Sequence, residues 1–182
     1  MTFNERNTNN LFYIFITTHL LVWTLVPSIT NNNLPLDTIE ALAWGSNMDW
    51  GFNKHPPLSA LSVEIFHQVF GSQDWAYYLL AQIYITLTFF VIWSFSKDFL
   101  KNETHRMISV LLLGGIYFYN YTTPEFNVYV CATPFWSLTI IPAPVTLDPK
   151  WVMPLPLSNS QRISSASLLY SANSKPRDFN SA

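Results

Sequence analysis

The sequence predicts an all-α integral membrane protein, and three observations lead to this fold class. Charged residues make up 11% of the 182 residues, well below the roughly 25% of an ordinary soluble domain. Aromatic residues reach 16%, and Trp and Tyr are enriched where membrane helices meet water. The apolar residues are concentrated in separate runs. These features predict about three membrane-spanning helices, with short amphipathic helices lying beside the membrane between the first two.

Three apolar runs are the candidate spans, at residues 11–29, 75–95 and 107–119. As a helix, the first run would be about 28 Å long, close to the thickness of the hydrocarbon layer. A cleaved signal peptide is the alternative for this run, but such a peptide has a shorter apolar core and a small-residue cleavage site. Buried core helices of a soluble protein are the alternative for the other two runs. The third run is short, so residues 120–138 are an alternative place for the chain to re-enter the membrane.

Basic residues predict the orientation of these spans. The 30–74 connection carries Lys54 as its one Lys or Arg residue, whereas the much shorter loop at 96–106 carries three and the ten-residue amino-terminal tail carries one. By the positive-inside rule the tail and the 96–106 loop are cytoplasmic and the 30–74 connection is periplasmic. The basic residues on the cytoplasmic side are Arg6, Lys97, Lys101 and Arg106.

The remaining composition limits the classes of function. The net charge is −2 and no basic stripe exists, so the sequence does not predict a nucleic-acid partner. The one cysteine, Cys131, can form neither an internal disulfide nor a thiolate metal cluster. Residues 139–182 are rich in Pro and Ser and lose apolar periodicity, which predicts a disordered tail. The predicted membrane domain therefore spans residues 1–138.

Two short helices are predicted in the 30–74 connection, and the first begins near Pro35. Asp37 and Glu40 lie three positions apart and share one face of this helix. Two carboxylates on one face outside the membrane could bind a divalent metal ion or act as a general base. The same spacing is that of a capping box, which stabilises a helix start and needs no chemistry. The spacing alone leaves both interpretations open.

The second helix follows Pro56 and Pro57, because proline suits the first helical turn. Its apolar residues recur at helical spacing and form one face, so the helix could lie flat at the membrane surface. Lys54 and His55 precede it, beside backbone N–H groups that favour anions. They are candidates for holding a lipid phosphate, and a solvated turn at a helix start is the alternative. The apolar residues are Leu58, Leu61, Ile65, Phe66 and Val69.

Residues 37–71 combine several motifs that resemble a known enzyme family. The acidic Asp37 follows the first predicted span, and the sequence at 54–58, Lys-His-Pro-Pro-Leu, precedes an apolar helix that ends in Phe70 and Gly71. The stretch 121–128, which contains Pro-Glu-Phe-Asn, is also similar. Together these resemble the amino-terminal portion of the C-type (GT-C) membrane glycosyltransferases, in particular glycosyltransferase family 39 and the aminoarabinose lipid A transferases. The resemblance covers residues 11–138.

The resemblance implies an enzyme that transfers a sugar from a polyprenyl-phosphate donor to a cell-envelope lipid, glycan or protein at the outer face of the bilayer. Asp37 matches the acidic position that serves as general base or organises the reaction centre, with Glu40 as the neighbouring catalytic candidate. Lys54 or His55 matches the basic position that binds the lipid-linked phosphate, and the match does not decide between them. Glu125 is a candidate second carboxylate from the next outer loop. Whether a metal is used stays open.

Family members are several hundred residues long and have many more spans. The resemblance therefore implies a truncated member, located in the bacterial inner membrane. The alternative from a different functional class is a non-catalytic small membrane protein that acts as a subunit or interaction module.

Overall fold

The computed structural model describes residues 5–47, 49–52 and 54–140, and every helix or strand within them is an α-helix. The all-α prediction is therefore confirmed for this part of the chain. The predicted tail lies, from residue 141 onward, outside the described residues, so its disorder stays a prediction. The helices are α1 (Glu5–Thr30), α2 (Leu36–Gly45), α3 (Pro57–Phe70), α4 (Asp74–Phe99), α5 (Glu103–Gly114), α6 (Tyr117–Asn120) and α7 (Val128–Ile140).

Two of these helices, α1 and α4, are long and apolar enough to cross a membrane. Each extends about 38 Å, more than the roughly 30 Å of the hydrocarbon layer. Their most apolar segments are only 28% and 44% buried inside the protein, whereas a core helix of a soluble protein is mostly buried. The exposed apolar faces therefore favour contact with lipid. These two helices correspond to the predicted spans at 11–29 and 75–95.

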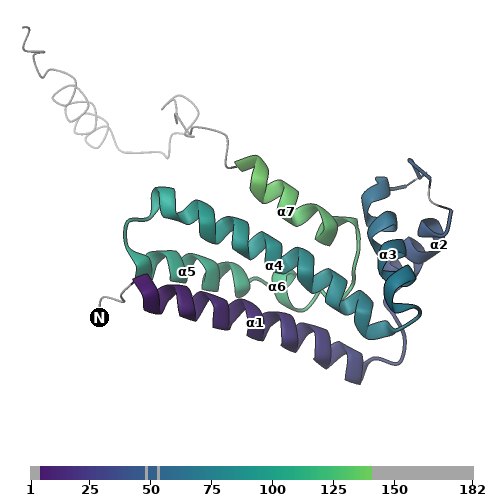
Figure 1. Cartoon of the computed structure of the whole chain (residues 1–182), viewed down its shortest axis with the longest axis horizontal. Helices are drawn as coiled ribbons and strands as arrows, with labels where there is room; N and C mark the ends of the chain where they lie inside the picture. The colour runs from purple at the N-terminus through teal and green to yellow at the C-terminus, as the bar shows by residue number, and fades with distance from the viewer. Residues whose placement is uncertain (1–4, 48, 53, 141–182) are drawn as a thin grey trace, which may run out of the picture. The chain divides into compact units, whose positions relative to one another are not determined.

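The two long helices run antiparallel and lie side by side, with α5 beside both (Figure 1). The rings of Phe12 and Trp93 stack at 4.5 Å near one end. Near the other end, the Asn31 amide donates a hydrogen bond of 3.2 Å to the Tyr78 hydroxyl. The start of α1 therefore lies beside the end of α4. The buried core follows this seam and includes Phe12, Ile16, Leu80, Ile85, Phe89 and Trp93.

The predicted third span, 107–119, is divided in the structure and is not one continuous helix. Helix α5 ends at Gly114, after about 18 Å, and α6 is a single turn. The Asn120 amide donates a hydrogen bond to the Gly114 carbonyl, which satisfies a backbone group at the break. Gly114 also lets α5 approach α1, because a Cβ there would lie 2.6 Å from the Phe15 ring. Residues 103–127 therefore lead from the α4–α5 turn to α2 as two helices and a loop and not as one continuous helix.

Helix α7 returns along α4, as Figure 1 shows. In the buried contact between them, the Thr88 hydroxyl donates a hydrogen bond of 2.9 Å to the Thr133 hydroxyl. Such paired hydroxyls are a common contact between helices in lipid. Most of helix α7 lies in the region 120–138 that the sequence offered as an alternative place of re-entry.

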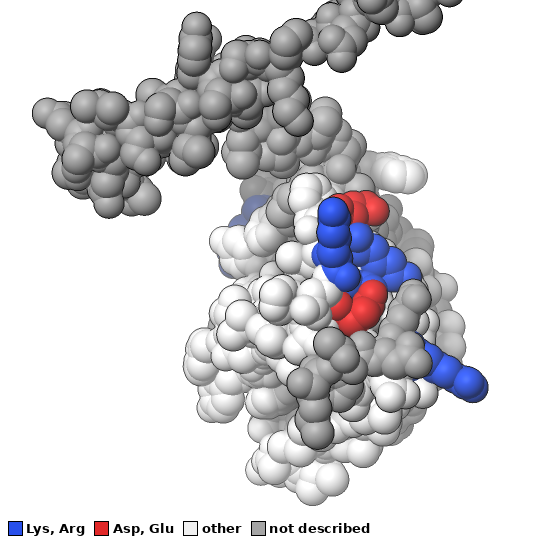
Figure 2. All heavy atoms as spheres, turned by 90° about the vertical axis from the view of Figure 1, so that its left-hand side faces the viewer, with Lys and Arg blue, Asp and Glu red and all other residues white. Residues whose placement is uncertain are grey.

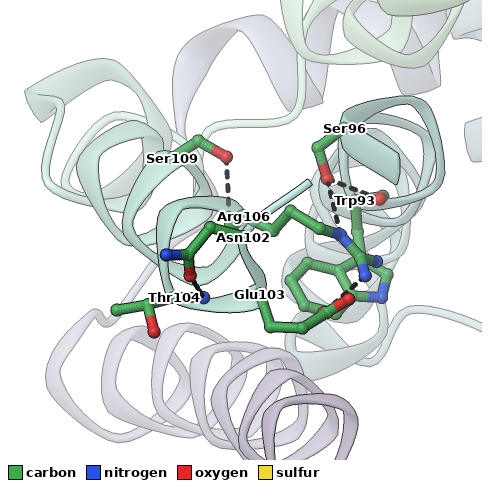
Figure 3. A network of polar contacts seen from close by, with 7 residues as sticks. All are labelled: Trp93, Ser96, Asn102, Glu103, Thr104, Arg106 and Ser109. Carbon is green, nitrogen blue, oxygen red and sulfur yellow. Dashed lines mark hydrogen bonds and ion pairs between the residues drawn. The ribbon is translucent and has the colours of Figure 1, made fainter. Parts of the chain in front are cut away.

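Charged side chains gather at the end of the molecule where α4 ends and α5 begins, which we call the charged end (Figure 2). Arg106 is only 2% exposed there and contacts three neighbours (Figure 3). Its guanidinium lies 4.2 Å from the centre of the Trp93 ring, forms an ion pair with Glu103 and donates a hydrogen bond to the Ser96 hydroxyl. A desolvated cation–π contact contributes about 2 kcal/mol. Arg106 therefore joins α5 to the end of α4.

Helices α2 and α3 pack against each other at the opposite end of the long helices (Figure 1). They cross closely at Gly45, where a Cβ would lie 2.6 Å from the Ala60 carbonyl oxygen. Helix α3 turns its small residues inward, and its larger apolar residues stay exposed, with Ile65 at 57% and Val69 at 68%. This agrees with the predicted amphipathic helix, since an apolar face outside the protein core is suited to a membrane surface. Gly71 ends α3 with a φ of 68°, a conformation that glycine adopts without strain.

Candidate active site

The first turns of α2 carry Asp37 and Glu40 on one helix face, and both line the same hollow. The helix begins after Pro35, and this N-cap residue makes no capping hydrogen bond with its side chain. The capping box that the sequence left open is therefore not formed. Asp37 instead lies inside the helix, where a carboxylate in the first turn interacts favourably with the helix dipole.

Lys54 pairs with the second of these carboxylates. Its Nζ lies 3.2 and 3.0 Å from the two Glu40 carboxylate oxygens. This hydrogen bond and the charge of Glu40, with a smaller contribution from the charge of Asp37, raise the pKa of Lys54 above its ordinary value. The amine is therefore held as a cation beside both carboxylates.

His55 has a different set of neighbours from Lys54. The Trp44 ring of α2 stacks on Phe52 at 5.6 Å and contacts the His55 ring at 5.4 Å. These aromatic contacts hold the connection between α2 and α3 against α2. His55 lines the hollow together with Asp37 and Glu40. Trp44 also lines this hollow.

The loop before α7 brings two more polar side chains to Asp37. The backbone N–H of Asp37 donates to the Glu125 carboxylate at 3.3 Å, and the Asn127 amide donates to the Asp37 carboxylate at 3.4 Å. A buried hydrogen bond of 3.2 Å from the Thr38 hydroxyl to the Phe126 carbonyl fixes this contact. The structure therefore brings together Asp37, Glu40, Lys54, His55 and Glu125, all five residues that the sequence singled out.

The hollow between them also contains the start of α3. Ser59 lines it from the first turn of that helix, where backbone N–H groups lack helical partners and favour an anion. The cluster thus places the Lys54 cation, the His55 ring and the start of a helix next to carboxylates. It could stabilise a negative leaving group and accept a proton. No group of three or more His, Cys, Asp or Glu side chains that could hold a metal ion exists among the described residues.

Asn127 is the neighbour of Asp37 that sequence reasoning did not select. Its side-chain oxygen accepts hydrogen bonds of 3.0 Å from the backbone N–H groups of Tyr129 and Val130, so it caps α7. An Asn directly before an apolar run is a recognisable helix-start signal. Its second contact, with Asp37, joins residues 90 positions apart and could not be derived from local pattern.

A comparison with known protein families gives a match over part of the chain. Residues 54–143 match the family model of dolichyl-phosphate-mannose-protein mannosyltransferases. No curated protein and no solved structure matches. The matched segment contains Lys54, His55 and Glu125, whereas Asp37 and Glu40 precede it. The resemblance noted for the sequence is thus confirmed over a shorter range than 11–138. The match supports a partial resemblance to the membrane glycosyltransferases of the C type, and the two apolar helices α1 and α4 agree with a membrane setting.

Proposed function

We propose that the chain takes part in transfer of a sugar from a polyprenyl-phosphate donor to an envelope acceptor at the α2–α3 end of the molecule. The single observation that carries this proposal is the convergence of Asp37, Lys54 and Glu125 from three separate segments. The family match supports the reaction class. By the distribution of basic residues, this end faces the periplasm of a bacterial inner membrane.

The leaving group in this reaction is the donor phosphate, and Lys54 and His55 bind it together with the first N–H groups of α3. Negative charge develops on the phosphate as the bond between the sugar C1 and the phosphate oxygen breaks, and preorganised cations and N–H donors stabilise that charge. Lys54 suits this role because a lysine amine is a cation at neutral pH, and Glu40 and Asp37 raise its pKa further. Glu40 holds it in place when no phosphate is bound.

The acceptor hydroxyl must lose its proton as its oxygen bonds to the sugar C1, and Asp37 is the carboxylate that accepts the proton. Asn127 donates to the Asp37 carboxylate and orients it. Glu40 is the weaker candidate, because Lys54 already occupies both of its oxygens. An acceptor that is already ionised, such as a phosphate, would leave Asp37 a positioning role only.

A transfer assay with the full chain in membranes tests this assignment. A radiolabelled short-chain polyprenyl-phosphate mannose serves as donor, and label is followed into lipid, glycan and protein fractions. We expect Asp37→Asn to lower transfer by about 100-fold or more, since a positioned general base contributes about 10²–10⁴-fold. The matched control is Asp49→Asn, an exposed carboxylate of the same connection, which should transfer like the wild type.

Two results would count against the proposal. If the Asp37→Asn variant transfers sugar as fast as the wild type, another group takes the proton. A wild-type chain that binds the donor but transfers no label would favour the alternative, a non-catalytic membrane subunit.

A further inference from the structure

The hollow at the candidate active site is too small for a sugar. Its volume, bounded by Asp37, Glu40 and His55, is about 10 Å³. That is enough for roughly one water molecule. If the chain binds a lipid-linked sugar, the bulk of the ligand must therefore lie outside this hollow.

A cavity of about 360 Å³ lies on the other side of Glu125. The last turns of α1 form one wall, and the loop that follows α6 forms the other. This volume falls within the roughly 300–1,000 Å³ of known small-molecule sites. Glu125 borders the cavity and also accepts the hydrogen bond from the Asp37 backbone N–H. A ligand that contacts Glu125 in the cavity would therefore be separated from the Asp37 backbone by this one carboxylate.

The cavity walls mix aromatic rings with hydrogen-bonding groups. Trp23 and Tyr121 supply the rings, and Asn31 and Glu125 supply an amide and a carboxylate. The Asn31 amide nitrogen is fixed by its hydrogen bond to the Tyr78 hydroxyl. The second carboxylate oxygen of Glu125 has no hydrogen bond to any described residue, so it is available to accept one.

This combination suits a pyranose ring rather than a phosphate. A pyranose has apolar C–H faces, which pack on aromatic rings, and hydroxyl groups, which donate to carboxylate and amide oxygens. A phosphate would meet the negative charge of Glu125, and no Lys, Arg or His is among the described residues that line the cavity. The two parts of a sugar phosphate therefore fit two different places, with the phosphate near Lys54.

We propose that this cavity binds the pyranose ring of the substrate, with Glu125 accepting hydrogen bonds from its hydroxyl groups and Trp23 packing on its face. The inference rests on the proposed function for the role of the bound ring, because only a sugar-transfer reaction requires a ring beside Asp37. The ring belongs either to the donor or to a glycan acceptor, and in both cases it offers the same apolar faces and hydroxyl groups to the cavity.

Equilibrium binding to the full chain in lipid nanodiscs tests the proposal. The radiolabelled probes are a short-chain polyprenyl-phosphate mannose and the same polyprenyl phosphate without sugar. We expect Glu125→Gln to weaken binding of the sugar-bearing probe by about tenfold or more, because hydrogen bonds to a charged acceptor are strong, and to leave the sugar-free probe unchanged. Lys54→Ala should weaken both probes.

Two further variants separate a lost ligand contact from a folding defect. Trp23→Leu changes the opposite wall and leaves the Asp37–Glu125 contact in place, and it should weaken only the sugar-bearing probe. Asp98→Asn removes an exposed carboxylate at the charged end and should change neither. If Glu125→Gln and Trp23→Leu both bind the sugar-bearing probe like the wild type, the donor ring does not lie in this cavity.

Methyl pyranosides of mannose and glucose then distinguish the two sources of the ring. An acceptor site predicts that one of them binds the wild type in the presence of the sugar-bearing probe, and that Glu125→Gln abolishes this binding. The cavity proposal is overturned if Glu125→Gln and Trp23→Leu both bind the sugar-bearing probe and the methyl pyranosides as tightly as the wild type does. If neither lipid phosphate binds the wild type, the proposed function fails. In that case the cavity proposal stands only if a methyl pyranoside binds the wild type and the Glu125→Gln substitution abolishes this binding.

Discussion

Lys54 lies near two carboxylates, Glu40 and Asp37, and they determine the pKa of its amine. Its amine bonds both oxygens of Glu40 and also feels the charge of Asp37, and the pKa of Lys54 is raised as a result. The ion pair is therefore fully present below the ordinary pKa of lysine and is lost only as the pH rises through the raised value. Because both partners are solvent-accessible, salt weakens their attraction. A phosphate ligand competes with Glu40 for the same cation.

Replacing Glu40 by Gln should lower the pKa of Lys54, because the largest contributions to the upward shift come from the Glu40 hydrogen bond and charge. The measurement is a pH titration of ¹³C-methylated lysines by NMR. The Lys101 signal, from the charged end, serves as the internal control and should not move. An unchanged Lys54 titration would mean that the pair is not formed in solution. The same variant should bind sugar-free polyprenyl phosphate more tightly, since the competing carboxylate is gone.

The candidate residues were predictable from the sequence, but their contacts were not. The acidic pair on α2 and the basic pair before α3 follow from spacing and from the family motif. The contact between Asp37 and Glu125 depends on how the loop before α7 packs against α2, and no local pattern encodes a pairing over 88 positions. The choice between a capping box and a paired carboxylate was open for the same reason, because the partner of Glu40 lies 14 positions away.

At the scale of elements, the crossing of α2 and α3 sets the geometry of the site. The first of these helices carries the carboxylates, and the start of the second follows Lys54 and His55. Their close approach depends on Gly45, because any Cβ there would come within 2.6 Å of the Ala60 carbonyl oxygen and 3.0 Å of the Glu64 Cβ. A backbone oxygen cannot turn aside as a side chain can. The two helices must therefore separate if residue 45 gains a side chain.

The variant Gly45→Ala should loosen this helix pair, although alanine is the better helix former. The gain in helix propensity is at most about 1 kcal/mol, whereas overpacking costs about 1–3 kcal/mol. Hydrogen–deuterium exchange of residues 36–70 measures the outcome, and faster exchange is expected. Gly51→Ala is the matched control, since no described atom lies within 4 Å of a Cβ built there. Equal protection in both variants would show that the crossing tolerates a methyl group.

A helix start near Pro35 predicted α2, and apolar periodicity after Pro57 predicted α3; the structure has both helices at these places. Periodicity did not predict the division of the third apolar run into α5 and α6. Hydropathy treats Gly114 and Gly115 as neutral members of a run, whereas in the folded protein the α1 contact at Gly114 and the Asn120 hydrogen bond end the helix. Tertiary contacts determine where α5 ends, and a hydropathy profile carries no information about such contacts.

Across the whole molecule, the described basic residues are distributed unequally between the two ends. Four of them, Arg6, Lys97, Lys101 and Arg106, lie toward the charged end, and Lys54 alone lies at the α2–α3 end. Figure 2 shows charged side chains gathered at the charged end. The positive-inside rule predicts a cytoplasmic charged end. The candidate active site would then open to the periplasm.

Cysteine labelling tests this orientation. In a Cys131→Ala background, Ser46→Cys and Lys101→Cys each add one thiol at an exposed position, at opposite ends of the long helices. A membrane-impermeant maleimide applied to spheroplasts should label residue 46 and should reach residue 101 only after permeabilisation. The reverse labelling pattern would place the candidate site in the cytoplasm and contradict the proposed site of transfer. The parent Cys131→Ala chain should stay unlabelled on both sides.

The buried position of Arg106 has a consequence for the time course of membrane insertion. If α5 is still unpacked while the nascent chain is sorted across the bilayer, the positive-inside rule predicts that Arg106 adds its full charge to that of Lys97 and Lys101 as a retention signal. After packing, the same guanidinium is 2% exposed, paired with Glu103 and stacked on Trp93. The positive-inside rule thus predicts that one side chain first directs the topology of the chain and later holds the end of the finished helix assembly together.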